Sequence, residues 1–301
     1  MNYNIVEDGD KIILKDMKDF EPKHIFECGQ AFRWNREEDG SYTTIAYGKV
    51  INVKREDRDI ILTNTDMKDF KDIWYNYFDL GRDYQEIKRE LSKDPILKEA
   101  IQYGEGIRIL NQEPFETTIS FIISANNQIP RIKKSIDLIS KYYGEEIYIQ
   151  EDIREEVFSN NTYYGFPTAK VLAKAKPEDL KEKCRVGFRD KRIVETSEII
   201  ANGDLDLDKI FELSRDEGKE MLMRLPGVGP KVSDCILLFA FNKDEAFPVD
   251  VWVKRVMEHF YLKEDTNVKH IGEHGARIFG SLAGFAQQYL FYYARELGIG
   301  K

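Results

Sequence analysis

Two hydrophobic periodicities follow one another along the chain. Between residues 11 and 63 apolar and polar side chains tend to alternate, which is the pattern of half-buried strands. Asp8-Gly9 and Asp39-Gly40 are turn dipeptides that favour hairpins between such strands. The strands that we expect, which together predict an antiparallel sheet, cover residues 11–14, 31–35, 41–47, 50–54 and 60–63.

From residue 66 onward apolar positions recur every three or four residues, which is the period of amphipathic helices. Proline, glycine or asparagine bounds most of these segments. The helices that we expect cover residues 84–91, 97–101, 114–124, 130–143, 169–173, 177–183, 189–202, 216–224, 231–241 and 251–261. Strands followed by helices, without alternating βαβ units, predict an α+β fold.

We expect two regions in a chain of this length. Residues 1–95 would form an N-terminal antiparallel sheet domain with flanking helices, and residues 96–301 a mainly α-helical body. A chain of 301 residues is long enough for a substantial hydrophobic core. The chain has no N-terminal signal pattern and no run of about 18 apolar residues, so we expect a protein that acts inside the cell and not in a membrane.

A tight turn joins two of the expected helices at about residues 215–241. The run from Leu225 to Lys231 contains two glycines, which permit positive φ and a close approach of the backbone to a ligand. Backbone amides at such a helix start favour a phosphate group. In isolation this is an ordinary helix connection with a solvated lysine. The apolar helix that follows favours the other interpretation, because Lys231 then begins a buried element.

An isolated aspartate, Asp250, comes after Pro248 and directly before the expected helix 251–261. Its ordinary role at this position is to cap the helix with its side chain. A carboxylate at a helix start can also face a cleft. Capping and a role in chemistry are therefore compatible for Asp250.

The hairpin and the aspartate together resemble the signature of the DNA glycosylase superfamily named after its helix-hairpin-helix and Gly/Pro-Asp motifs (HhH-GPD). Members that also cut the DNA backbone carry a lysine at the position of Lys231, whereas members that only hydrolyse the glycosidic bond lack it. The resemblance implies that Lys231 attacks C1′ and forms a Schiff base, which permits β-elimination. It implies that Asp250 stabilises the positive charge that develops on the sugar.

The same resemblance implies that the hairpin binds the DNA backbone. Gly227, Val228 and Gly229 would contact a phosphate, with a monovalent cation on the hairpin carbonyls. Trp252 stands where better-known members have a histidine near a phosphate, so we expect packing or indole N–H donation to replace that contact.

The three cysteines narrow the branch of the superfamily. Cys28, Cys184 and Cys235 lie far apart, which excludes a disulfide framework and a CxxC metal site. The endonuclease III and adenine-mismatch branches usually carry a four-cysteine iron–sulfur loop after the aspartate helix, whereas residues 262–301 contain no cysteine. We therefore expect neither a metal site nor a cofactor.

The run from Cys28 to Trp34 reads Cys-Gly-Gln-Ala-Phe-Arg-Trp. By composition alone it is the start of a strand with packed aromatic residues. It resembles the Gly-Gln-x-Phe-Arg-Trp run of 8-oxoguanine DNA glycosylases, in which the glycine carbonyl accepts a hydrogen bond from N7–H of the oxidised base. This role maps to Gly29. Ordinary guanine has an acceptor at N7, so the carbonyl would face a lone pair, at a cost of about 1–3 kcal/mol.

A loop with paired asparagines joins two of the expected helices. Such residues are ordinarily caps and turn formers. In the resembling family an Asn-Asn-x-x-x-Arg loop fills the space left by the flipped base and reads the orphaned cytosine. The resemblance implies this role for Asn126 and Arg131, and Asn127 becomes a candidate for the base pocket.

Two further segments complete the resemblance. Phe188 and Arg189 match an aromatic wedge and an arginine that contacts the cytosine, although eukaryotic members usually have tyrosine at the position of Phe188. Gln287 and Phe291 lie four residues apart, on one helical face, where core packing is the ordinary role. The resemblance implies that Phe291 and Cys235 enclose the extruded base and that Gln287 binds its Watson–Crick edge.

The net charge of −9 argues in bulk against a DNA-binding protein. Local charge decides binding, however, and net charge mainly affects solubility. Basic residues gather near the segments that we expect to contact DNA, namely Arg131, Lys133, Lys134, Arg189, Lys191 and Arg192.

The sequence therefore predicts a monomeric, bifunctional DNA glycosylase and abasic-site (AP) lyase that excises 8-oxoguanine opposite cytosine from duplex DNA. Two alternatives remain open at this point. The first is an HhH-GPD glycosylase for another damaged base. The second is a helix-hairpin-helix DNA-binding protein without activity, in which Lys231 only neutralises phosphate and Asp250 only caps its helix.

Overall fold

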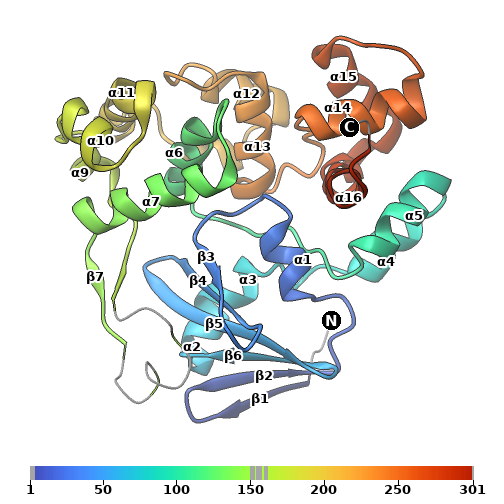
Figure 1. Ribbon diagram of the computed structural model, residues 1–301, viewed down its shortest axis with the longest axis horizontal. Coiled ribbons are helices and arrows are strands. Elements are labelled where there is room, and N and C mark those ends of the chain that lie inside the picture. Colours follow the sequence, from blue (N-terminus) through green and yellow to red (C-terminus); the bar gives the residue numbers. More distant parts are fainter. Residues whose placement is uncertain (1–3, 150–152, 154–157, 159–161, 300–301) are drawn as a thin grey trace.

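The computed structural model of the protein describes residues 4–149, 153, 158 and 162–299. A sheet forms one layer, blue in the lower part of Figure 1, and the helices form a larger layer above it. This arrangement confirms the expected α+β order of strands first and helices after. Among the described residues, no helix is long and apolar enough to cross a membrane.

The sheet has six antiparallel strands in the order β1-β2-β6-β5-β4-β3. Their bounds are β1 (Asn4–Asp8), β2 (Lys11–Lys15), β3 (Trp34–Arg36), β4 (Tyr42–Ala46), β5 (Lys49–Glu56) and β6 (Asp59–Thr63). Ile12 pairs with Leu62 and Leu14 pairs with Ile60, and all four side chains are fully buried. The alternation that predicts the strands thus also packs the sheet.

Two expectations about the strands were wrong. Strand β1 was missed because four of its five side chains are exposed, so it carries no alternation to detect. Strand β3 begins at Trp34 and not at Ala31. Residues 31–33 have no strand conformation, and they follow Gly29, whose φ of +80° is that of a turn.

Short helices cover the sheet. They are α1 (Pro22–Glu27), α2 (Met67–Asp69), a π-helical turn (Phe70–Trp74) and α3 (Tyr75–Tyr77). Trp74 and Phe78 are fully buried against sheet residues such as Ile12 and Val53. Helix α1 was missed from the sequence because six residues are too few to display a helical period.

The helical body contains the remaining elements. They are α4 (Tyr84–Leu91), α5 (Pro95–Tyr103), α6 (Pro114–Ser124), α7 (Ile129–Tyr143), α9 (Ala169–Leu172), α10 (Pro177–Lys183), α11 (Asp190–Ala201), α12 (Arg215–Leu222), α13 (Pro230–Ala240), α14 (Val251–Met257), α15 (Val268–Phe279) and α16 (Ala283–Leu297), with short 3-10 or π turns at Gly187–Arg189, Asp208–Phe211, Glu258–Leu262 and Gly280–Leu282 and a two-stranded ribbon of β7 (Glu146–Ile147) and β8 (Tyr163–Tyr164). Helices α4 and α5 begin at the aspartate caps Asp83 and Asp94, and a Ser214–Glu217 capping box begins α12.

Helix α15 was missed from the sequence because it contains Gly272 and Gly275, and glycine is more typical of loops than of helices. A Cβ atom at Gly275 would lie 2.5 Å from Cε1 of Phe247, so the glycine lets the helix pack on that ring. The glycine that weakens the helical pattern is thus required by the packing of the helix.

An extended linker over residues 107–113 runs between the two layers and joins α5 to α6 (Figure 1). It bonds to both layers: Asn111 N–H donates to Tyr77 O at 3.0 Å, and Gln112 N–H donates to Phe239 O at 2.9 Å. Helix α5 packs on α16, in the core of the helical body. The division of domains at residue 95 stays a prediction.

Candidate active site

The expected helix-hairpin-helix is present as α12, a tight turn and α13. Lys219 on α12 forms an ion pair with Asp234 on α13, with 2.7 Å between Nζ and Oδ2, which fixes the two helices together. Gly227 in the turn has a φ of +89°, and a Cβ atom there would lie 2.9 Å from Cδ of Arg192. The turn therefore requires glycine at this position.

The other two hairpin residues differ from expectation. Gly229 has a φ of −98°, so it does not use the positive φ that its glycine permits. The Val228 side chain is buried in the core, and its N–H donates to Leu225 O at 3.1 Å. The Val228 amide is thus already bonded within the turn, which leaves Gly227 and Gly229 as the candidates for a phosphate.

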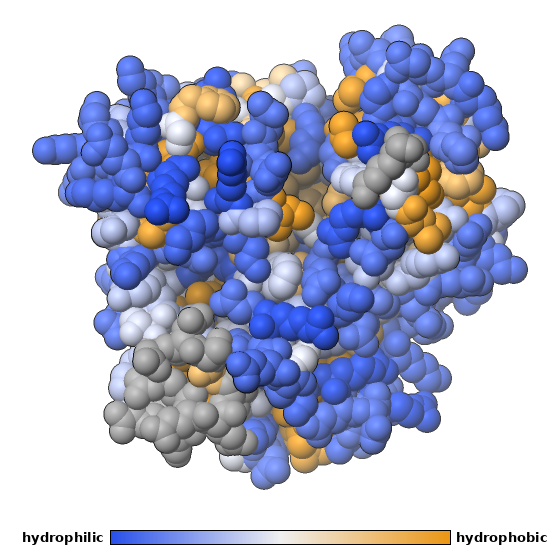
Figure 2. Space-filling model, viewed as in Figure 1, coloured by the Kyte–Doolittle hydropathy of each residue, from blue (hydrophilic) through white to orange (hydrophobic). Residues whose placement is uncertain are grey.

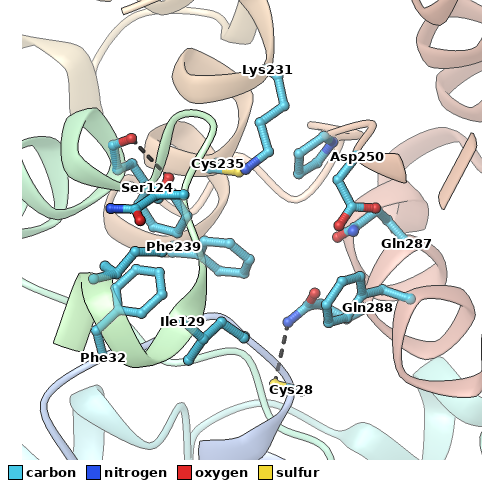
Figure 3. Close-up of a pocket in the computed structure, with 16 residues that line it drawn as sticks. Cys28, Phe32, Ser124, Ile129, Lys231, Cys235, Phe239, Asp250, Gln287 and Gln288 are labelled. Carbon is cyan, nitrogen blue, oxygen red and sulfur yellow. Dashed lines mark hydrogen bonds between the residues drawn. The ribbon is translucent and has the colours of Figure 1, made fainter. Parts of the chain in front are cut away.

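Lys231 lies in the first turn of α13, and its amine points into a pocket toward Cys235 (Figure 3). Its Nζ points toward the Cys235 thiol (Figure 3) and lies 5.5 Å from the centre of the Phe121 ring. Burial lowers the pKa of the Lys231 amine. The electrostatic influence of Cys235 and Asp250 outweighs burial, so the pKa of Lys231 is raised above the usual value. Burial also raises the pKa of Cys235 to about 11, so this thiol is neutral near pH 7. We therefore regard Asp250 as the charge that keeps Lys231 protonated.

Asp250 caps α14, as expected. Its Oδ1 accepts hydrogen bonds from Trp252 N–H at 2.9 Å and Val253 N–H at 2.8 Å. Burial raises the pKa of this carboxyl, opposed by those amides and by Lys231. The carboxylate also lines the pocket that holds the lysine amine, so one side chain both caps a helix and faces a cleft.

The pocket is a cavity of about 150 Å³ between α6 and α13 on one side and α14 and α16 on the other (Figure 3). It brings together every residue predicted for catalysis or for the base pocket: Gly29, Asn127, Lys231, Cys235, Asp250, Gln287 and Phe291. Pocket residues that the sequence did not single out include Cys28, Phe32, Phe121, Ile129, Phe239 and Gln288. Hydrophobic patterns predict that most such residues are buried, but not that they line a cavity.

Gly29 and Phe291 are in contact although they lie at opposite ends of the chain. A Cβ atom at residue 29 would be 3.2 Å from Cε1 of Phe291, and the positive φ at this residue also favours glycine. Any larger side chain at this position would press against the ring. The glycine thus admits a close approach between the N-terminal loop and α16.

Gln287 is 5 % exposed, and its Oε1 has no hydrogen-bond partner among the described residues. A buried acceptor without a donor is unfavourable in the free protein, and a ligand that supplies an N–H group would satisfy it. The neighbouring Gln288 instead donates to the Cys28 thiol at 3.4 Å (Figure 3). Of the two adjacent amides, Gln287 is the one available to a ligand.

The residues predicted to attend the partner base lie outside the pocket. Asn126, with a φ of +51°, and Arg131 are exposed. Phe188 is 58 % exposed, and the guanidinium carbons of Arg189 and Arg192 lie 4.3 Å and 5.4 Å from the centre of its ring. An exposed aromatic ring flanked by two cations is suited to contact with nucleic acid.

Arg189, which is predicted to contact the cytosine, already has partners in the free protein. Only 6 % of it is exposed, and its guanidinium donates to the carbonyls of Ala125 and Asn126, the latter at 3.2 Å. In the free protein this arginine holds the asparagine loop against the Phe188 turn.

The surface around the pocket is polar. Figure 2 shows an indentation between the two upper lobes in which apolar residues are visible within a hydrophilic rim. Of the predicted basic residues, those that are exposed are Arg131, Lys134, Lys191 and Arg192. Lys133 is not available, because its Nζ lies 3.5 Å from the centre of the Trp34 ring and donates to Trp34 O. Trp252 is half-buried, with the guanidinium carbon of Arg255 5.1 Å from the centre of its ring.

Two family models together match most of the chain. Residues 12–118 match "8-oxoguanine DNA glycosylase, N-terminal domain", and residues 119–279 match "HhH-GPD superfamily base excision DNA repair protein". The chain belongs to the HhH-GPD superfamily. The HhH-GPD match includes the hairpin, Lys231 and Asp250, and the N-terminal match includes Gly29.

Relatives of this HhH-GPD protein are similar over most of their length. An 8-oxoguanine glycosylase/lyase of Clostridium acetobutylicum, solved with DNA containing cytosine opposite 8-oxoguanine, is 47 % identical, with a TM-score of 0.94 over 99 % of this chain and 100 % of that one. A "Probable N-glycosylase/DNA lyase" of Methanothermobacter thermautotrophicus is 36 % identical over 74 % of each chain. The N-glycosylase/DNA lyase of Arabidopsis thaliana is 26 % identical over 88 % of this chain and 75 % of its own.

Metal-ligating side chains do not gather in the part of the chain that the structure describes: no group of three or more His, Cys, Asp or Glu there could hold a metal ion. The three cysteines of the sequence are all buried and free. A four-cysteine cluster cannot be assembled from this chain.

Proposed function

We infer that this protein is a bifunctional DNA glycosylase and AP lyase that excises 8-oxoguanine from duplex DNA. The observation that carries this conclusion is the shared pocket, in which Lys231 and Asp250 lie beside Gly29 and the unsatisfied acceptor of Gln287. A nucleophile and a set of base contacts in one cavity are what excision of a base requires. A stacked duplex exposes neither C1′ nor the base edge, so the nucleotide must leave the helix to enter the pocket.

The base pocket reads the oxidised base from three directions. The Gly29 carbonyl accepts from N7–H, which guanine lacks. Gln287 Oε1 accepts from the Watson–Crick edge, where both N1 and N2 of the base carry hydrogens. Phe291 and Cys235 enclose the two faces of the ring, and Asn127 lines the pocket beside them. An unmodified guanine would leave a carbonyl opposite a lone pair, which disfavours it by about 1–3 kcal/mol.

Excision begins when the Lys231 amine loses its proton and attacks C1′. The bond from C1′ to the base nitrogen breaks, and the base leaves with that electron pair and gains a proton. Opening of the sugar then gives the Schiff base, and loss of a C2′ proton expels the 3′ phosphate by β-elimination. Asp250 stabilises the cationic sugar electrostatically and also holds Lys231 in its protonated resting form.

Residues outside the pocket hold the rest of the duplex. Phe188 wedges into the base stack, Asn126 and Arg131 fill the space left by the flipped base and read the orphaned cytosine, and Arg189 contacts that cytosine. For Arg189 this means exchanging the carbonyls of the asparagine loop for the base.

The DNA backbone lies against the hairpin and the start of α14. Gly227 and Gly229 offer amides to phosphates, and Trp252 stands at the start of α14, beside Asp250. The monovalent cation on the hairpin carbonyls stays a prediction. We propose that the enzyme acts inside the cell, as a monomer and without an organic or metal cofactor, on lesions opposite cytosine.

The substrate is tested with end-labelled duplexes that differ only in the central base: 8-oxoguanine opposite cytosine, 8-oxoguanine opposite adenine, an alkylated purine, and guanine. Base loss is measured after alkali and lyase activity without it. We expect the first duplex to be processed fastest and guanine not at all. Equal or faster removal of the alkylated purine would show that another lesion is the substrate. Binding without any cleavage would show that the protein is not an enzyme.

A further inference from the structure

Gln30 follows Gly29 in the chain, and no part of it is exposed. Its Oε1 accepts from Leu110 N–H at 2.9 Å, and its Nε2 donates to Arg108 O at 2.8 Å. Accepting from one residue and donating to the residue two positions away is how a strand pairs with an extended neighbour. The side-chain amide of Gln30 therefore makes the hydrogen bonds to the linker 107–113 that a neighbouring strand would otherwise make. Its Nε2 also donates to Ile25 O at 2.8 Å, at the end of α1.

Gln112 continues this connection to the helix of the nucleophile. Its side-chain Nε2 donates to Gln30 O at 2.8 Å, and its backbone N–H donates to Phe239 O at 2.9 Å. Phe239 lies on α13, about two helical turns after Lys231, and lines the same pocket. A short path of hydrogen bonds thus joins the N-terminal loop to α13.

The path holds the residue that directly follows the Gly29 carbonyl. That carbonyl belongs to the peptide unit that ends at the nitrogen of Gln30, and Gln30 is held through both its side chain and its own carbonyl. A hydrogen bond is lost when one of its atoms shifts by about 1 Å. A carbonyl oxygen of the backbone can therefore recognise a base only if the neighbouring residues hold it in place.

We propose that Gln30 and Gln112 are positioning residues that fix the Gly29 carbonyl relative to Lys231, and that they thereby determine recognition of the oxidised base. This inference rests on the proposed function, because Gly29 is a reader only if 8-oxoguanine is the substrate. Its consequence is selective. A preformed abasic site has no base for the carbonyl to read, so its cleavage by Lys231 does not depend on this path.

The deciding variant is Gln112→Met, which keeps the length of the side chain and removes its N–H donor. Two single-turnover rates are measured on matched duplexes, one for excision of 8-oxoguanine opposite cytosine and one for cleavage of a preformed abasic site. We expect excision to fall about tenfold to a hundredfold. Abasic-site cleavage should stay within about twofold of the wild-type rate, because the hairpin and Asp250 are untouched.

A matched control lies one residue earlier on the same linker. Asn111 is also a buried amide, and its Nδ2 donates to Asn76 O at 2.7 Å, away from the Gly29 loop. Asn111→Leu should lower the melting temperature without changing the ratio of the two rates. Gln30→Ala should change that ratio more than Gln112→Met does, since it leaves Leu110 N–H and Arg108 O unpaired. If it does not fold, Gln112→Met decides alone.

Two results for Gln112→Met would overturn the inference: both rates falling by the same factor, or excision remaining at the wild-type level. Failure of the proposed function is distinguishable from either, because it is seen in the unmodified protein. A wild-type enzyme that cleaves abasic sites and leaves 8-oxoguanine in place would contradict the proposed substrate, and with it the reading role of Gly29, before any variant is measured.

Discussion

The two sides of the pocket are built in different ways. The reaction side, Lys231 and Asp250, comes from the first turn of α13 and the cap of α14, which are near neighbours in the sequence. The reading side places Gly29 of the N-terminal loop against Phe291 of the last helix. One side is set by local turns and caps, and the other by packing between distant segments.

This difference assigns different consequences to the two sides. A change on the reaction side should affect bond breaking on every substrate, whether or not a base is present. A change on the reading side should affect only substrates that carry a base. Comparing excision of 8-oxoguanine with cleavage of a preformed abasic site therefore separates the two sides in one protein.

The largest effect is expected from Lys231→Gln. Both rates should fall about a thousandfold or more, because no other amine lines the pocket where the structure describes it. Single-turnover gel assays measure both. Lys219→Gln is the matched control, since it removes a lysine of the same hairpin that pairs with Asp234 and lies outside this pocket. Lys219→Gln should keep both rates within a few-fold of wild type. If it lowered both rates as much as Lys231→Gln does, Lys231 would act only through its positive charge and not as the nucleophile.

Asp250→Asn should slow both reactions about a hundredfold while DNA binding changes little. Asparagine caps a helix as well as aspartate does, so α14 and the fold remain. Fluorescence anisotropy with an abasic-site analogue measures binding separately from the rates. If binding and both rates fell together, Asp250 would be a structural cap and nothing more.

Phe291→Ala tests the reading side. Excision of 8-oxoguanine should fall about tenfold to a hundredfold through loss of stacking, with abasic-site cleavage within about threefold of wild type. Phe279→Ala removes a similar ring that packs on Phe247 outside the pocket, and should lower only the melting temperature. Equal losses in both assays for Phe291→Ala would show that the two sides are not separable.

The smallest expected effect is a shift in pH dependence. The reaction needs neutral Lys231, whose pKa is raised above the usual lysine value, so both rates should rise as pH increases from 7 to 9. In Asp250→Asn the supporting negative charge is gone, so the pKa of Lys231 falls and the rising limb moves to lower pH. An unmoved limb would mean that Asp250 does not hold the lysine proton.

The reaction side was predictable from sequence because its signals are local. A glycine turn, a proline at the helix start and an aspartate before the next helix draw attention to Lys231 and Asp250 without any distant contact, and the resemblance then supplies their roles in the reaction. Even here φ angles were not predictable: Gly227 needs its glycine, whereas Gly229 does not use a positive φ. The sequence shows where glycine permits a positive φ, whereas packing determines whether the residue adopts it.

The reading side was found by resemblance and could not have been derived from residue patterns. No role was predicted for Gln30, which lies in the Gly-Gln-x-Phe-Arg-Trp run, or for Gln112, because their hydrogen-bond partners are about 80 residues away or on α13 and no periodicity encodes such contacts. Arg189 was expected to contact the cytosine, and no sequence pattern showed that in the free protein it also bonds to the carbonyls of the asparagine loop. Long-range hydrogen bonds are the part of this site that sequence patterns do not contain.

Excision and lyase cleavage both depend on a bond between the Lys231 amine and C1′ of the damaged nucleotide. Its most direct test is borohydride trapping on a duplex with 8-oxoguanine opposite cytosine, followed by proteolysis and mass spectrometry of the linked peptide. We expect a covalent adduct on the peptide that contains Lys231, and none with Lys231→Gln. An adduct at another residue, or an undiminished adduct in the variant, would contradict it.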